Sequence, residues 1–180
     1  MEILPKGASL PKKKMKKVDF YADVLVHLNE VGILLQFLQK YNMDAVHKIG
    51  FWASIRMILP IVEAVAKVAG EKKEKFLYNH LNIKTPYLVW DMFRHPLIHG
   101  EYLQYGEYQS KQVGWKVVMK GQGHVFTSSV IEIDVACLYD KLREFLENEV
   151  KMNDQSIVEI AVGVVYSNPQ RGIADDFSKL

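Results

Sequence analysis

Apolar residues recur at helical spacing just after a short basic segment. Within residues 18–42 they stand alternately three and four positions apart, at Tyr21, Val24, Leu28, Val31, Leu35 and Leu38. This spacing predicts an amphipathic helix with one apolar face. Residues 44–70 are more uniformly apolar and predict a long, mostly buried helix. Pro60 lies in its interior, so we expect either a kink near Leu59 or a break into two helices.

Two shorter helices are expected before the middle of the chain. The first runs through FLYNHL, residues 76–81, after a charged corner at Gly70. The second begins at the pair Thr85-Pro86, in which a capping hydroxyl precedes a proline at the first helical position. It continues through YLVWDMFR, residues 87–94.

The periodicity changes after Gly100. Trp115, Val117 and Met119 alternate with other residues, and a glycine-rich KGQG then leads into HVFTS, which predicts a β-hairpin over residues 113–128. A last long helix follows, capped by Asp134. Residues 154–166 fit either a helix or a β-branched strand, because a short apolar run does not decide by its period.

These elements predict a mainly all-α protein, a four- to five-helix up-and-down bundle with an inserted β-hairpin near 113–128. Residues 1–17 are expected to form a basic flexible arm. Residues 18–166 are expected to form a single helical domain, and residues 167–180 a mobile tail. A chain of 180 residues, 49% of them apolar, is long enough for one core.

Charge separates the basic segment from the rest of the chain. Six lysines and one glutamate give residues 1–17 a net charge of +5, so the other residues carry −3 of the total of +2. A lysine run of this kind either docks on nucleic-acid phosphates or is simply solvated. The candidate RNA-binding lysines are Lys12, Lys13, Lys14, Lys16 and Lys17.

The single cysteine and the hydropathy pattern indicate the cellular compartment in which the protein is expected. Cys137 has no partner for an internal disulfide. No apolar stretch reaches the roughly 18 residues that span a membrane. We therefore expect a soluble cytoplasmic protein with no membrane partner.

The segment FRHPLIHGEY, residues 93–102, concentrates the residue types that chemistry needs. Arg94 and His99 form the pattern R-x4-H, with His95 directly after the arginine and Gly100 directly after the histidine. This pattern resembles the signature of the HEPN superfamily, in which an arginine, a polar residue and a histidine lie in an all-helical bundle. The resemblance rests on about seven residues and the helical setting.

The resemblance implies a metal-independent endoribonuclease without a cofactor, often a toxin or defence factor. It also implies a homodimer in which Arg94 and His99 of both subunits face one another, and an antitoxin or other partner protein. In such a reaction His99 acts as general base or acid, and the Arg94 guanidinium holds the phosphate. His95 and Asp91 are candidate supporting residues, and Tyr102 is a candidate for stacking on a base.

Helix geometry makes Pro96 important for this hypothesis. Five residues along a regular helix turn through about 500°, so Arg94 and His99 would point about 140° apart. They converge only if the helix ends or bends between them, and Pro96 favours such a bend.

Three other interpretations of the segment stay open. In the first, Arg94 and His99 have a structural role alone: Arg94 hydrogen-bonds the free carbonyl groups at the end of a helix, and His99 caps the corner that follows. His95 and His99 can bind zinc with Glu101, although Pro96 disturbs their spacing, and our prediction is that no metal is bound. The chain can also be a non-catalytic HEPN-like protein that binds nucleotide or RNA, or a dimeric scaffold.

Overall fold

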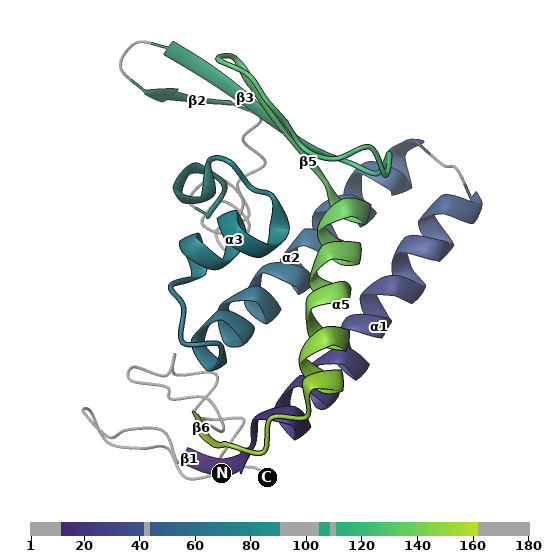
Figure 1. Ribbon diagram of the computed structural model, residues 1–180. Helices are drawn as coiled ribbons and strands as arrows, with labels where there is room; N and C mark the ends of the chain where they lie inside the picture. The colour runs from purple at the N-terminus through teal and green to yellow at the C-terminus, as the bar shows by residue number, and fades with distance from the viewer. Residues whose placement is uncertain (1–11, 42–43, 91–104, 109–110, 162–180) are drawn as a thin grey trace, which may run out of the picture. The chain divides into compact units, whose positions relative to one another are not determined.

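The computed structural model describes most of the chain (Figure 1). The described residues are 12–41, 44–90, 105–108 and 111–161. Their contacts divide the chain into two units. A terminal unit combines Met1–Lys17 with Gln155–Leu180, and a central unit is formed by Val18–Asp154.

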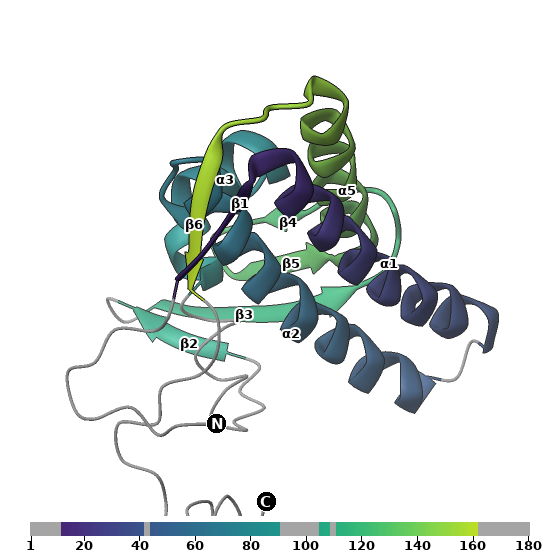
Figure 2. The ribbon, with the colours of Figure 1, turned by 90° about the horizontal axis from the view of Figure 1, so that it is seen from below.

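The terminal unit contains a two-stranded antiparallel sheet. Strand β1 (Lys12–Lys16) pairs with strand β6 (Ile157–Ala161), and Lys14 lies opposite Glu159. Figure 2 shows the two strands side by side. The basic segment is therefore a paired strand over these five residues, where the sequence predicted a flexible arm. The open choice for residues 154–166 is decided as a strand over residues 157–161.

The central unit is built mainly from helices. They are α1 (Lys17–Tyr41), α2 (Asp44–Val68), α3 (Lys73–Leu81) and α5 (Val135–Met152). Residues 86–90 are also helical, so the start predicted at Pro86 is confirmed, but the Thr85 hydroxyl expected to cap it makes no hydrogen bond within the described residues. Helix α2 runs through Pro60 without a break, so of the two outcomes expected there, a kink near Leu59 or a division into two helices, the division is wrong.

The core of the central unit lies where α1, α3 and α5 meet. Phe145 of α5 makes edge-on contacts with Tyr21 of α1 and Phe76 of α3, with ring centroids 6.1 Å and 4.8 Å away. Five of the six apolar positions predicted for the face of α1 are buried, and the sixth, Val24, is half-buried. Helix α2 packs on α3 and α5, so four helices share one apolar interior.

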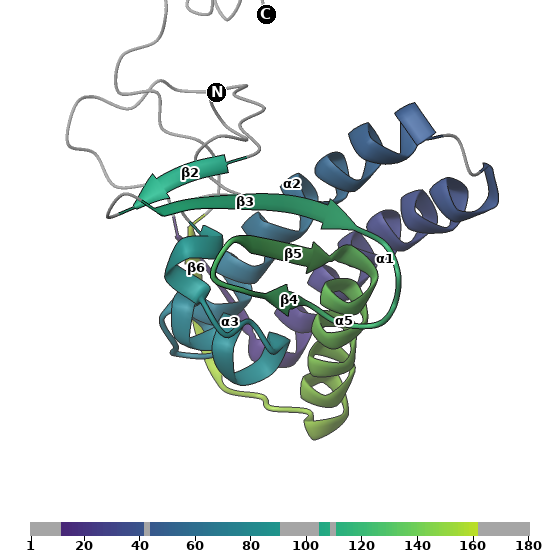
Figure 3. The ribbon, with the colours of Figure 1, turned by 90° about the horizontal axis from the view of Figure 1, so that it is seen from above.

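A four-stranded sheet joins the helices in the central unit. Its strands are β2 (Tyr105–Tyr108), β3 (Lys111–Val118), β4 (Val125–Phe126) and β5 (Val130–Asp134). They lie in the order β2-β3-β5-β4, as Figure 3 shows. Strand β3 packs against α2, and β5 leads directly into α5.

The predicted hairpin over residues 113–128 is wrong in its pairing. Strands β3 and β4 are not neighbours, because β5 lies between them, parallel to β3 and antiparallel to β4. The physical reason is burial. Ile131 and Ile133 of β5 are buried, so this strand takes the interior position, and the two-residue β4 forms an edge.

The described residues are thus mainly helical, with two small sheets. None of the helices within them combines the length and the hydropathy that crossing a membrane requires.

Candidate functional site

The residues of the R-x4-H motif lie outside the described part of the chain. Arg94 and His99, with the supporting candidates His95 and Asp91, fall within residues 91–104, and so does Tyr102. Their arrangement stays a prediction. The helical residues 86–90 lead directly into this segment, and the Val89 N–H donates to the Thr85 carbonyl at 3.0 Å.

The candidate RNA-binding lysines lie mostly on β1. Lys12, Lys13, Lys14 and Lys16 are all exposed. Glu159 of β6 is the acid that faces them, with its carboxylate 3.3 Å from the Lys12 ammonium and 3.8 Å from that of Lys14. One carboxylate does not neutralise four lysines, so the described strand pair keeps a positive charge.

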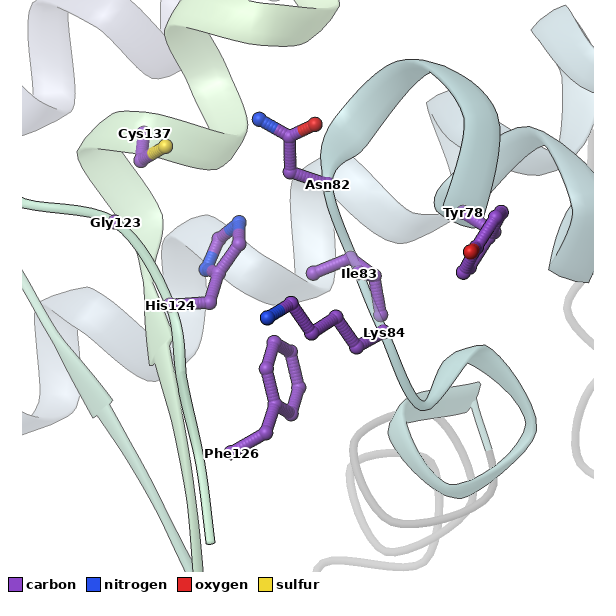
Figure 4. Close-up of a pocket in the computed structure, with 8 residues that line it drawn as sticks. All are labelled: Tyr78, Asn82, Ile83, Lys84, Gly123, His124, Phe126 and Cys137. Carbon is purple, nitrogen blue, oxygen red and sulfur yellow. The ribbon is translucent and has the colours of Figure 1, made fainter.

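The central unit contains a pocket of about 470 Å³ (Figure 4). It is formed where the end of α3, the segment after it, the loop before β4 and the first turn of α5 come together. Its described lining residues are Tyr78, Asn82, Ile83, Lys84, Gly123, His124, Phe126 and Cys137.

The end of α3 positions one side of the pocket. Asn82 ends the helix in the left-handed conformation, with φ of 57°, which asparagine tolerates better than most residues. The next N–H, of Ile83, donates to the Leu77 carbonyl at 3.1 Å. Because Ile83 is buried, its neighbours Asn82 and Lys84 are carried to the surface beside the pocket.

The loop between β3 and β4 positions the other side, and it turns around Asp134. Strands β3 and β5 are parallel, so the chain leaves β3 at the same edge where β5 ends. The fully buried Asp134 carboxylate accepts hydrogen bonds from the Lys120 and Gln122 N–H groups of this loop at 3.3 Å and 3.0 Å. It also accepts from two N–H groups in the first turn of α5, as a helix N-cap does.

Glycines allow this loop to turn so tightly. Gly121 and Gly123 have φ angles of 67° and 98°, which residues with a Cβ atom rarely adopt. The chain then reverses into β4 on the far side of β5. His124, directly after the second glycine, is thereby placed in the wall of the pocket.

His124 is held as a neutral ring. Its Nδ1 atom accepts a hydrogen bond from the Asp134 N–H at 3.1 Å, so the proton of the neutral ring is on Nε2. Burial lowers the pKa of His124 below its usual value. The Asp134 carboxylate and the Leu81 carbonyl act in the opposite direction with smaller effect. The ring is therefore uncharged at neutral pH.

The pocket has the features of a binding site more than those of a catalytic one. Among its described lining residues Lys84 carries a charge and there is no carboxylate. Burial, as the main cause, raises the pKa of the Cys137 thiol, which is thus protonated and weakly nucleophilic at neutral pH. Across the described residues, no three His, Cys, Asp or Glu side chains are grouped as metal ligands would be.

Sequence reasoning missed the residues of this pocket. Asn82 and Lys84 come from one segment, His124 and Phe126 from a second and Cys137 from a third, and no local pattern joins the three. The glycines of KGQGH indicated a turn, but they did not reveal that the turn encircles a buried aspartate.

Comparisons of the chain with family models, with curated proteins and with solved structures found no match.

Proposed function

We propose that the protein is a metal-independent endoribonuclease of the HEPN type that acts as a homodimer. The observation that carries the proposal is the R-x4-H motif of Arg94 and His99, which follows the helical residues 86–90 in a mainly helical chain. In this proposal the helices form an up-and-down bundle, and the motif residues of two subunits meet in one cleft.

Each motif residue has a defined role in the proposed reaction. The 2′-hydroxyl of RNA attacks the adjacent phosphorus, the bond to the 5′-oxygen breaks, and the products carry a 2′,3′-cyclic phosphate and a 5′-hydroxyl. His99 takes the proton from the 2′-hydroxyl or gives one to the leaving 5′-oxygen. Arg94 binds two phosphate oxygens, because its planar guanidinium matches their geometry. His95 and Asp91 support this pair.

The β1 lysines support an RNA substrate. Lys13 and Lys16 are exposed and form no ion pair within the described residues, whereas Lys12 and Lys14 share Glu159. Lysines on a strand can contact successive phosphates of an RNA backbone. In a cytoplasmic toxin of this type, a partner protein would restrain the activity until it is needed.

The test is cleavage of single-stranded RNA in the presence of EDTA. We expect the wild-type protein to cut the RNA, and Arg94→Ala and His99→Ala to lose at least about a hundredfold in rate, because the first removes the charge that holds the phosphate and the second the general acid or base. Arg56→Ala and His27→Ala are matched controls, since both residues are exposed on helices of the central unit. Cleavage that survives either motif substitution removes the assignment.

Three further measurements separate the nuclease from a non-catalytic protein. Overproduction should suppress growth, and His99→Ala should restore it. RNA ends should carry cyclic phosphates, and light scattering should give a dimer. A dimer that binds RNA but leaves it intact, and whose overproduction is harmless, identifies the HEPN-like binding or scaffold protein instead.

A further inference from the structure

We propose that the pocket beside His124 binds one nucleotide, with the base against Phe126 and the phosphate at Lys84. The inference rests on the proposed function only in naming RNA as the source of that nucleotide. It concerns residues outside the R-x4-H motif, and binding can be measured without cleavage.

The size of the pocket fits a ligand of this class. Its volume of about 470 Å³ lies within the range of roughly 300–1,000 Å³ that is typical of small-molecule sites. The pocket is too small for a nucleic-acid duplex. A single unstacked base with its sugar and phosphate does.

Aromatic side chains supply a surface for the base. Phe126 of β4 is half-buried in the wall, and Tyr78 of α3, with 60% of its surface exposed, lies at the side. Bases stack on such rings whatever their identity, because every base has a flat π face. The Asn82 amide offers both a donor and acceptors to a base edge or a ribose hydroxyl.

Lys84, the charged residue of the described lining, favours an anionic ligand. Figure 4 shows the Lys84 side chain extending between Phe126 and His124, with its ammonium group directed into the pocket. None of the described lining residues is acidic, and His124 adds no charge because its pKa is lowered. One ammonium group matches one phosphate, which favours a monophosphate or an internal RNA nucleotide over a triphosphate.

Cys137 makes the test direct, since it lines the pocket and is the single cysteine of the chain. The rate of its alkylation is measured at mildly alkaline pH, where a thiol of raised pKa reacts. The protein carries Arg94→Ala, so that RNA is not cleaved. The probes are uridine 5′-monophosphate, a short oligouridylate, uridine and inorganic phosphate, each at the same concentration.

The nucleotide probes should slow alkylation more than uridine or phosphate alone. Lys84→Gln should weaken this protection about five- to tenfold, and Phe126→Leu by a similar factor, as loss of a charged contact or of a stacked base does. Asn82→Gly keeps the left-handed backbone and should weaken it less. Lys75→Gln changes an exposed lysine of α3 that does not line the pocket and should have no effect.

Protection by the oligouridylate alone supports an RNA subsite, and protection by the monophosphate alone supports a free nucleotide as the source. Equal protection by phosphate alone overturns the proposal, as does protection that persists in both Lys84→Gln and Phe126→Leu. Absence of protection by every probe also overturns it. Cleavage by the parent protein is assayed in parallel, so loss of nuclease activity and loss of nucleotide binding are scored separately.

Discussion

The ring of His124 and the backbone of Asp134 are joined by a hydrogen bond of 3.1 Å, from the Asp134 N–H to Nδ1. The same aspartate uses its side chain to hold the loop from which His124 emerges. One residue thus fixes both the path of the loop and the tautomer of the histidine. The pocket wall depends on this relationship.

The half-buried His124 should make stability depend on pH. The pKa of His124 is lowered in the folded protein from its usual 6.5, mainly by burial. Because the folded pKa lies below 6.5, the unfolded chain binds more protons as the pH falls through 6.5, so the free energy of unfolding should fall there. His124→Gln removes the titrating ring and should reduce this slope. Urea unfolding at several pH values measures it.

His27→Gln is the control for this prediction, because His27 is exposed on α1. Its slope should match that of the wild-type protein. A His124→Gln slope equal to that of the wild-type protein would contradict a neutral His124 ring with a lowered pKa.

Asp134 should be among the most sensitive polar positions of the central unit. Its carboxylate is buried and accepts four backbone N–H groups, from Lys120, Gln122, Ala136 and Cys137. Asp134→Ala leaves these donors without their acceptor and should lower the free energy of unfolding by about 2–3 kcal/mol. Asp140→Ala, at an exposed position of α5, should change the free energy of unfolding little. Equal effects in denaturant titrations would argue against the anchoring role.

Glu132 should stabilise the sheet in the same pH range where it is charged. Only 6% of its side chain is exposed, and its carboxylate lies 2.7 Å from the Lys116 ammonium and 2.8 Å from that of Lys120. These two hydrogen bonds lower its pKa from the usual 4.5. Glu132→Gln should therefore lower the free energy of unfolding by about 1–2 kcal/mol at neutral pH.

The sign of the pH effect follows from the lowered pKa. The stability that Glu132 contributes is fully present above about pH 4.5 and is lost as the pH falls through the folded pKa. The wild-type protein and Glu132→Gln should thus converge in acid, as thermal unfolding can show. Glu147→Gln, in an exposed pair with Arg143, should match the wild-type protein throughout.

Helices could be predicted from the sequence because their signal is local. The three- and four-residue spacing in residues 18–42 and the capping Asp134 both act within a few positions, and α1 and α5 follow them closely. Either a kink or a break at Pro60 was predicted from the same local chemistry; the break does not occur, and burial of the neighbouring apolar residues favours a continuous α2.

Pairing between distant segments could not be predicted in this way. Strand β1 consists largely of lysines, and its partner β6 lies at the other end of the chain. The order of β3, β5 and β4 depends on which strand has the most apolar surface to bury. That depends on comparing separate strands, and a short stretch of sequence does not contain this comparison. The pocket could not be predicted for the same reason, because its residues come from separate segments that meet only when the sheet and helices pack together.

Helices α1 and α5 approach closely at Gly32 and Tyr139. The effect of Gly32→Ala on stability should therefore depend on whether the Tyr139 side chain is present. Gly32 is buried within α1, and a Cβ atom added there would overlap the phenol of Tyr139 on α5. Alanine favours a helix over glycine by about 1 kcal/mol, but this overlap forces Tyr139 to move. Gly32→Ala should therefore destabilise the wild-type protein, by about 1 kcal/mol in urea unfolding.

In a Tyr139→Ala background the same substitution has no phenol to displace. Gly32→Ala should then stabilise the protein by up to about 1 kcal/mol, the helix preference alone. The coupling between the two positions in a double-mutant cycle measures the contact directly. Effects that simply add would show that α1 and α5 do not approach at these two residues, and the packing of the two helices would need to be reassigned.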